Sequence, residues 1–344
     1  MKSIVHWRPL ALFAIAILGL ALRLYGLNWD QGNSFHPDER QILFHVTVLS
    51  WPNSLAQFLD PVNSPLNPHF FAYGSFPLYL LATAGNILAH FYPDVTTLAN
   101  LTLVGRVLSA IFDSGTILLT GWLALLLADD TTSQRQYAWS LAFLSATLVA
   151  FTPLQLQLSH FYAVDTLLLF FTMLTVLACV ALVNTDAPIR WSLVAGLGYG
   201  LALATKFSAA PLIVPLMISL MLRWHKHGLY SALLSFLLTI CVSAATFLIA
   251  MPYALLDRQN FVQQLSAQGD LARGYLDLPY VRQVCRYNTI SLRGSEYAFL
   301  GYGSDAWPGS VHGTALVLLA GMAAQCFSLA DCTVMGAGLW RLNW

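Results

Sequence analysis

Charged residues are scarce in this chain. Asp, Glu, Lys and Arg together make up 9% of its 344 residues, and 57% are hydrophobic. Soluble domains carry about 25% charged residues. With so few charges the chain cannot cover the surface of a water-soluble globule, so the composition predicts an integral membrane protein. The formal net charge is zero, which argues against a nucleic-acid partner.

Cysteine patterns that indicate chemistry are also missing. The five cysteines include no CxxC pair and none at metal-ligand spacing from a histidine, so neither a disulfide framework nor a zinc site is indicated. The chain has no credibly placed Walker or GxGxxG loop, no solenoid repeat and no low-complexity tract. Nucleotide binding by a glycine-rich loop is therefore not expected.

Long apolar segments are present and predict seven transmembrane helices. Lys2 and Arg8 precede the first segment, and Tyr25 and Trp29 follow it, so the N-terminus is expected in the cytoplasm. No convincing cleavage site follows, which indicates an uncleaved span rather than a signal peptide. The predicted spans are residues 9–27, 104–128, 137–158, 166–183, 191–205, 211–222 and 229–251.

The segment 28–101 is then a long extracytoplasmic loop, rich in proline, asparagine and aromatic residues. Residues 37–49 are expected to form a surface helix. Residues 70–90 are apolar enough to span, but a span there would invert every later loop and move four basic residues outside: Arg135, Arg190, Arg223 and Lys226. A juxtamembrane helix against the outer leaflet is therefore predicted.

The densest ionisable cluster near the N-terminus is the stretch 34–40. Pro37 suits the first position of a helix, and Ser34 or Asn33 is the expected N-cap. Asp38 and Glu39 then occupy the first turn, where they either stabilise the helix start or present a carboxylate that activates an acceptor hydroxyl.

On the predicted topology seven ionisable residues share the outer side: Asp38, Glu39, His69, Arg106, His160, Asp165 and Lys206. Each alone could be a paired or snorkelling structural residue. Ionisable groups at membrane depth are costly and tend to mark function, so their convergence on one face favours a functional site.

Five short motifs occur in order along the chain: Phe35–Glu39, Pro68–Phe71 with Phe76–Tyr79, Val104–Arg106, His160–Asp165 and Ala204–Lys206. Each is weak alone. Together, over roughly residues 10–283, they resemble the GT-C superfamily of polyprenyl-phosphate-sugar-dependent glycosyltransferases, in particular the bacterial branch of glycosyltransferase family 39. That branch is akin to protein O-mannosyltransferases and lipid A aminoarabinose transferases. The resemblance implies an all-α polytopic membrane protein whose long first outer loop contains juxtamembrane helices.

The resemblance also implies roles. Asp38 would be the catalytic base or the carboxylate that orients the acceptor, supported by Glu39 and Asp165. Lys206 and Arg106 would hold the carrier phosphate, and the expected supporting histidines are His36, His69 and His160. The enzyme would move a sugar from a polyprenyl-phosphate carrier to a hydroxyl of a lipid, glycan or protein outside the bacterial plasma (inner) membrane.

Several alternatives stay open. The expected chemistry requires no cofactor; a divalent metal near His69 or His160 is an open alternative that no residue spacing indicates. A non-catalytic membrane scaffold is one other class of protein. A transporter is another, although the chain shows no repeated halves and its charges cluster on one face.

The resemblance ends near Gln283. Residues 284–344 hold three of the five cysteines and one plausible span, 311–330. Removing one nucleotide after the Gln283 codon, with permitted codons, restores an apolar reading frame of the family's kind. We therefore expect residues 1–283 to form the catalytic module and the tail to be a frameshifted or truncated region, which would leave the chain inactive or unstable. A genuine divergent tail is the alternative.

Overall fold

The computed structural model describes residues 7–128 and 134–272. Residues 1–261 form one compact unit, and a second unit begins at Val262. The described part of the second unit is the helical stretch 262–272, which completes α13 (Arg258–Ala272). The expected frameshifted tail, residues 284–344, lies outside the described residues.

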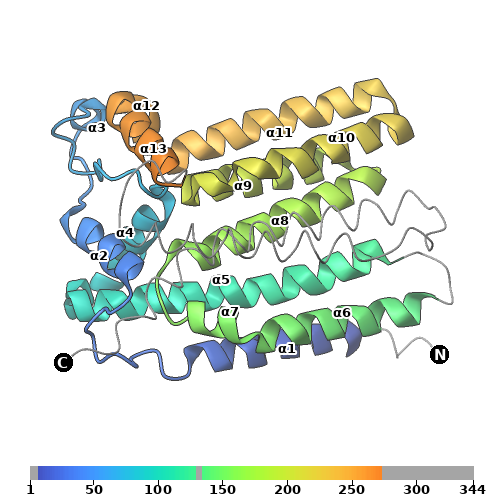
Figure 1. Ribbon diagram of the computed structural model, residues 1–344, viewed down its shortest axis with the longest axis horizontal. Helices are drawn as coiled ribbons and strands as arrows, with labels where there is room; N and C mark the ends of the chain where they lie inside the picture. Colours follow the sequence, from blue (N-terminus) through green and yellow to red (C-terminus); the bar gives the residue numbers. More distant parts are fainter. Residues whose placement is uncertain (1–6, 129–133, 273–344) are drawn as a thin grey trace, which may run out of the picture. The chain divides into compact units, whose positions relative to one another are not determined.

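Seven long helices of the first unit run side by side, alternating in direction (Figure 1). They are α1 (Trp7–Leu24), α5 (Leu98–Leu127), α6 (Gln134–Phe151), α8 (Val164–Asn184), α9 (Pro188–Thr205), α10 (Ile213–His227) and α11 (Leu229–Ala250). All regular elements in the described residues are helical. The predicted all-α polytopic membrane fold is confirmed.

Five of these segments are long and apolar enough to cross a membrane: α1, α5, α8, residues 207–227 and α11. The fourth joins the 3₁₀ helix η2 (Phe207–Leu212) to α10. Helix α6 has a shorter apolar part, Tyr137–Phe151, and α9 contains Arg190 and three glycines, which lower its apolar character. The seven predicted spans thus correspond to seven observed helices, and five of them meet this criterion.

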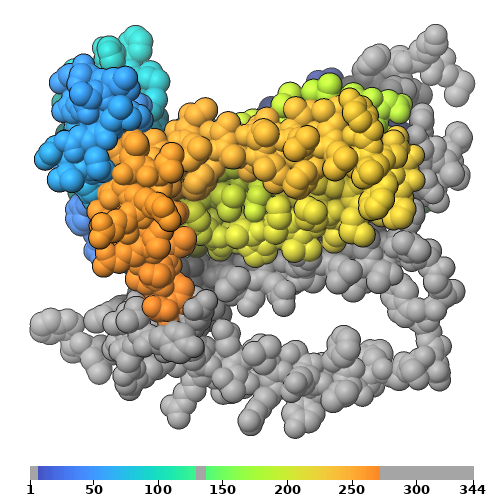
Figure 2. All heavy atoms as spheres, turned by 90° about the horizontal axis from the view of Figure 1, so that it is seen from above, coloured from blue at the N-terminus to red at the C-terminus, as the bar shows by residue number. Residues whose placement is uncertain are grey.

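Short helices gather at one end of the long ones (Figure 1). They are α2 (Pro37–Val48), α3 (Leu55–Leu59), α4 (Phe76–Ala89), η1 (Pro93–Thr96), α7 (Pro153–Leu158) and α12 (Tyr253–Leu256). Figure 2 shows the segment that contains α2 and α3, in blue, beyond the ends of the yellow helices. The surface helix expected over residues 37–49 is α2.

The apolar stretch 70–90 is only partly helical. Helix α4 has 14 residues, whereas a spanning helix needs about 20 at a rise of 1.5 Å per residue. Its length agrees with the prediction that this segment does not span. Residues 70–75 are non-helical, and this unpredicted break brings them against the end of α9.

A buried apolar cluster joins the short helices to the long ones. It includes Ile42 of α2, Leu78 and Leu81 of α4, Leu101 of α5 and Leu167 of α8. All but Leu101 are fully buried, and Leu101 is 4% exposed. Because these side chains pack together, α2 is held against α5 and α8.

Candidate active site

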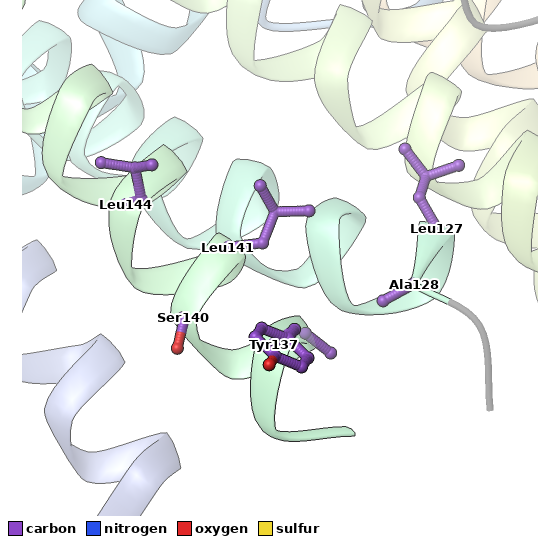
Figure 3. A pocket seen from close by; sticks show the side chains of 7 residues that line it. Leu127, Ala128, Tyr137, Ser140, Leu141 and Leu144 are labelled. Atoms are coloured by element: carbon purple, nitrogen blue, oxygen red, sulfur yellow. The ribbon is translucent and has the colours of Figure 1, made fainter. Parts of the chain in front are cut away.

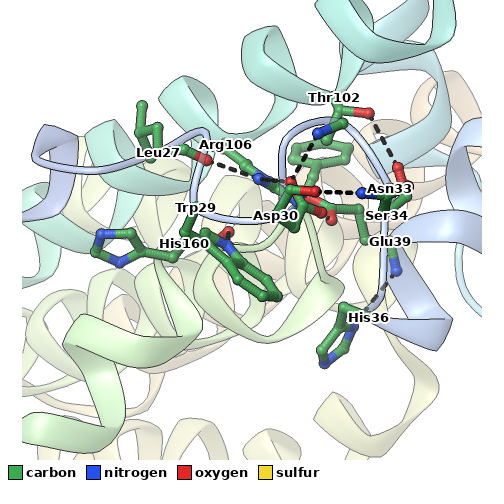
Figure 4. A network of polar contacts seen from close by, with 12 residues as sticks. Leu27, Trp29, Asp30, Asn33, Ser34, His36, Glu39, Thr102, Arg106 and His160 are labelled. Atoms are coloured by element: carbon green, nitrogen blue, oxygen red, sulfur yellow. Dashed lines mark hydrogen bonds and ion pairs between the residues drawn. The ribbon is translucent and has the colours of Figure 1, made fainter.

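Arg106 of α5 is the centre of a buried acidic cluster (Figure 4). Its Nε and Nη2 donate to the two carboxylate oxygens of Glu39 over 2.9 and 2.7 Å. Its Nη1 and Nη2 donate to the two oxygens of Asp30 over 2.9 and 2.7 Å. The second N–H of Nη1 donates to the Leu27 carbonyl oxygen over 2.6 Å.

A guanidinium has five N–H groups, and all five are therefore engaged. Arg106 and Glu39 are fully buried, and Asp30 is 3% exposed. In this arrangement Arg106 has no N–H left for a carrier phosphate. The geometry therefore does not support the predicted phosphate role of Arg106. The planar guanidinium that could bind a phosphate binds two carboxylates here instead.

Asp30 was not among the residues singled out from the sequence. It lies in a tight turn that includes Gln31, Gly32 and Ser34 at φ of 55°, 83° and 47°. The Gly32 N–H donates to Asp30 Oδ1 over 3.2 Å. Hydrogen bonds from Arg106 hold the pKa of Asp30 below its usual value. The Asp-Gln-Gly-Asn sequence has turn character, but it does not reveal an arginine partner 76 residues later.

Asp38 differs from its neighbour Glu39 in both exposure and partners. Helix α2 begins at Pro37, so the N-cap is His36, whose Nδ1 lies 3.5 Å from the Glu39 N–H. The expected cap at Ser34 or Asn33 is wrong, because both lie too early; Ser34 instead contacts Thr102. Asp38 is half-buried, and no hydrogen bond or ion pair joins its carboxylate to another described residue.

Tyr162 connects the loop between α7 and α8 to this cluster. Its backbone N–H donates to Glu39 Oε1 over 2.8 Å, and its hydroxyl donates to the Pro77 carbonyl over 2.7 Å. A Cβ on Gly105 would lie 2.6 Å from the Tyr162 ring, so the absence of a side chain there lets the ring pack on α5. Tyr162 is fully buried, and burial raises the pKa of its phenol.

The loop that contains Tyr162 leads into a second charged pair. Lys206 Nζ lies 3.1 Å from Asp165 Oδ1, and the two side chains are 18% and 7% exposed. Asp165 is in the first turn of α8, and Lys206 directly follows the last residue of α9. No other described residue bonds the ammonium, which leaves two N–H groups for a ligand. The sequence predicted only that Asp165 and Lys206 lie on the same side of the membrane. The structure shows that they form an ion pair.

The three candidate histidines occupy different surroundings. The His36 ring stacks on Phe161 with centroids 4.4 Å apart. His160 has its ring nitrogens 2.6 and 2.8 Å from the Leu156 and Tyr25 carbonyl oxygens. His69, at φ 47°, has Nδ1 3.5 Å from Asp257. Within the described ranges no three His, Cys, Asp or Glu residues are grouped so that they could hold a metal.

A cavity of about 530 Å³ lies far from these residues (Figure 3). Its lining includes Leu127, Tyr137, Ser140, Leu141 and Leu144. Leu127 is 21 positions after Arg106 on α5, which corresponds to about 30 Å along a helix. The pocket therefore lies at the other end of the bundle, and Tyr137 is the one ionisable group among its lining residues.

Comparison with known proteins identifies the family and the fold of the chain. Residues 55–266 match the family described as dolichyl-phosphate-mannose-protein mannosyltransferase. The fold is similar to that of the S. cerevisiae protein O-mannosyltransferase Pmt1-Pmt2 complex bound to the sugar donor, at 16% identity and a TM-score of 0.55, covering 76% of this chain and 35% of that one.

The fold is also similar to that of the oligosaccharyltransferase AglB from Archaeoglobus fulgidus, in complex with an inhibitory peptide and a dolichol-phosphate. The identity is 15% and the TM-score 0.51, covering 97% of this chain and 38% of that one. The chain thus spans little more than a third of either structure. Direct sequence comparison with curated proteins gives no match.

The family match includes Arg106, Asp165 and Lys206 and begins after Asp38 and Glu39. It covers more than half of the chain, and the fold is that of GT-C enzymes. The resemblance seen in the sequence is therefore confirmed for the family and the fold. The chain belongs to the dolichyl-phosphate-mannose-protein mannosyltransferase family.

Proposed function

We propose that this chain transfers a sugar from a polyprenyl-phosphate carrier to an acceptor hydroxyl, with Asp38 as the base. One observation supports this most directly. Arg106 binds Asp30 and Glu39, which leaves the adjacent Asp38 as a carboxylate without a described partner. The Asp165–Lys206 pair is joined to the same cluster through the loop that contains Tyr162.

At the donor, Lys206 meets the carrier phosphate. As the bond between the anomeric carbon and the phosphate oxygen breaks, the oxygen leaves with the electron pair and negative charge grows on the phosphate. The two N–H groups that Lys206 does not give to Asp165 can donate to that charge. Asp165 is then a positioning residue, because its carboxylate fixes the ammonium.

At the acceptor, the hydroxyl oxygen forms the new bond to the anomeric carbon and its proton passes to Asp38. Glu39 and Arg106 are positioning residues, since their buried bonds hold the first turn of α2. The neighbouring structures contain a sugar donor or a dolichol-phosphate, which supports a lipid-linked donor here. Lipid, glycan and protein acceptors are all compatible with a hydroxyl beside Asp38.

We also propose that the site faces the outside of a bacterial plasma membrane. The basic residues Arg8, Arg190 and Lys226 lie at the ends of the long helices remote from α2, as the positive-inside rule expects for the cytoplasmic side. On this basis the short helices and the two charged clusters are extracytoplasmic.

The experiment is to incubate membranes with a panel of polyprenyl-phosphate sugars and to measure released lipid phosphate. Asp38→Asn should lower the turnover number by about 10²–10⁴, the range of general-base assistance, with donor binding retained. Asp94→Asn, an exposed carboxylate in the same outer segment, is the matched control and should keep wild-type turnover. Near wild-type turnover in folded Asp38→Asn would remove Asp38 from the proposal.

A further inference from the structure

The last turn of α9 is capped by the non-helical segment 70–75. The backbone N–H of Gly74 donates to the Thr205 carbonyl over 3.0 Å. The final carbonyls of a helix have no partner within it, so this bond closes α9 at the residue before Lys206. Lys206 then leaves the helix in an extended conformation, at φ −159° and ψ 132°.

Gly74 has no room for a side chain. A Cβ at this position would lie 1.8 Å from the carbonyl oxygen of Ala204, 2.2 Å from its carbonyl carbon and 2.8 Å from the Thr205 nitrogen. All three are backbone atoms of α9, which cannot rotate aside as a side chain can. The close approach of segment 70–75 to the end of α9 therefore requires glycine at position 74.

The same segment contacts two other helices of the site at its ends. The Phe70 ring stacks on His45 of α2, with centroids 4.2 Å apart. Phe76, the first residue of α4, packs edge-on against Phe171 of α8 at 5.6 Å. Segment 70–75 thus touches α2, which contains the proposed base, and the end of α9 before Lys206, and the residue that follows it, Phe76, touches α8, which contains Asp165.

We infer that Gly74 is a positioning residue for Lys206: its backbone contact with Ala204 and Thr205 sets where the ammonium stands relative to the outer segment that contains Asp38. This inference rests on the proposed function, in which Lys206 binds the carrier phosphate. A side chain at position 74 displaces the end of α9 and moves the ammonium away from the donor. The chemical groups of the site remain present, but the phosphate contact is lost.

The test compares the full chain with Gly74→Ala, Lys206→Ala and the double variant, measuring the donor KM in membranes. We expect each single variant to raise the donor KM about 10- to 100-fold, the scale of losing one charge-assisted contact. Because both act through the same ammonium, Gly74→Ala should change the donor KM less than about twofold when Lys206 is already alanine.

Gly200→Ala is the matched control. Gly200 lies on the same helix, and its Cβ would meet the Ser243 carbonyl oxygen at 2.6 Å, but it faces α11. The Gly200→Ala variant should lower the thermal unfolding midpoint and keep the donor KM within about twofold of the wild-type value. If Gly74→Ala does not accumulate folded, Thr205→Gly loosens the same turn without adding an atom and should raise the donor KM.

The outcomes separate the two proposals. A raised donor KM in Lys206→Ala with an unchanged value in folded Gly74→Ala, or in Thr205→Gly where that variant replaces it, overturns the positioning role alone. Fully additive effects of Gly74→Ala and Lys206→Ala overturn it as well, because Gly74 would then act elsewhere. An unchanged donor KM in Lys206→Ala overturns the phosphate role of Lys206, and the inference with it.

Discussion

Arg106 shows how one side chain can look like a phosphate ligand in a sequence and bind buried carboxylates in the fold. An arginine near the end of a spanning helix suits a phosphate or a buried carboxylate equally well, since the donor geometry is the same. Its two acidic partners come from a loop and a short helix that are 76 and 67 positions away. Only the tertiary structure reveals that they meet.

Arg106→Lys should therefore destabilise the protein rather than weaken donor binding. Lysine keeps the charge but offers three N–H groups in place of five. At least two of the five hydrogen bonds from Arg106 are lost, and each hydrogen bond to a charged group contributes about 1.5–3 kcal/mol. Thermal unfolding in detergent measures the loss. If Arg106→Lys raises the donor KM without lowering the thermal unfolding midpoint, Arg106 contacts the carrier phosphate after all.

Asp30 gives the same cluster a pH dependence. Its pKa in the folded protein is lowered by the Arg106 hydrogen bonds, so the stability from this pairing is fully present above the usual aspartate pKa of about 3.9. It is lost as pH falls through the lowered folded value. The unfolding midpoint should stay level from pH 7 to about 5 and fall below about pH 4.

Asp60 is the control for this titration. Hydrogen bonds from Asn63 and Val62 also lower its pKa, but it lies at the surface. Asp60→Asn should keep the acid-induced fall, and Asp30→Asn should show a lower midpoint at neutral pH with a shallower fall. Equal slopes in Asp30→Asn and the wild type would exclude Asp30 as the group responsible.

At the scale of elements, the sequence predicted α2 and the non-spanning α4 and missed the break before α4. Pro37 and the acidic first turn mark the start of α2. The apolar run 70–90 has no such signal, so the sequence predicts one helix there. The helix instead begins at Phe76, and the residues before it contact the end of α9 through Gly74. The sequence also placed the start of α5 near Val104, although the helix begins at Leu98, since Arg106 is buried rather than interfacial.

Helices α1, α5 and α6 are joined by another buried arginine. Arg23 Nε donates to Asp113 Oδ2 at 2.5 Å, and its Nη1 and Nη2 donate to the Ala150 and Val149 carbonyls at 3.1 and 3.3 Å. These carbonyls lie at the end of α6, where Pro153 removes an N–H. Arg23 therefore caps the C-terminal end of α6 and forms an ion pair with Asp113 of α5.

Arg23→Leu should lower stability by about 3–5 kcal/mol, because it leaves Asp113 buried and unpaired. Arg23→Leu combined with Asp113→Leu should recover part of the loss, since an apolar pair of similar volume is tolerated better than a lone charge. Thermal unfolding of the two variants in detergent checks this order. A double variant no more stable than the single one would contradict it.

At the scale of the whole molecule, helix number and order could be predicted because long apolar segments separated by polar turns are a strong signal. The pairing of charged residues could not be predicted, because it depends on the conformation of loops, and loop sequences have no hydrophobic periodicity from which a conformation can be inferred. Asp38 and Glu39 illustrate this. Neighbours on a helix point about 100° apart, so one faces Arg106 and the other does not, and the sequence alone does not say which.

The orientation in the membrane can be tested with single cysteines. Asn63, between α3 and α4, and Asp186, between α8 and α9, are both exposed and lie at opposite ends of the helices. A membrane-impermeant thiol reagent on intact cells should label Asn63→Cys and not Asp186→Cys, with the unmodified chain as background. Labelling of Asp186→Cys alone would reverse the orientation.

The Asp165–Lys206 pair is close to neutral as a unit, and the Arg106 cluster has two carboxylates for one guanidinium. These two clusters therefore project no net positive field that could draw a phosphate in from a distance. On the proposed function, a lipid-linked donor reaches Lys206 by lateral diffusion and meets its charge only at contact. Occupancy then follows the mole fraction of donor in the bilayer leaflet, a two-dimensional concentration, rather than its molarity in the surrounding water.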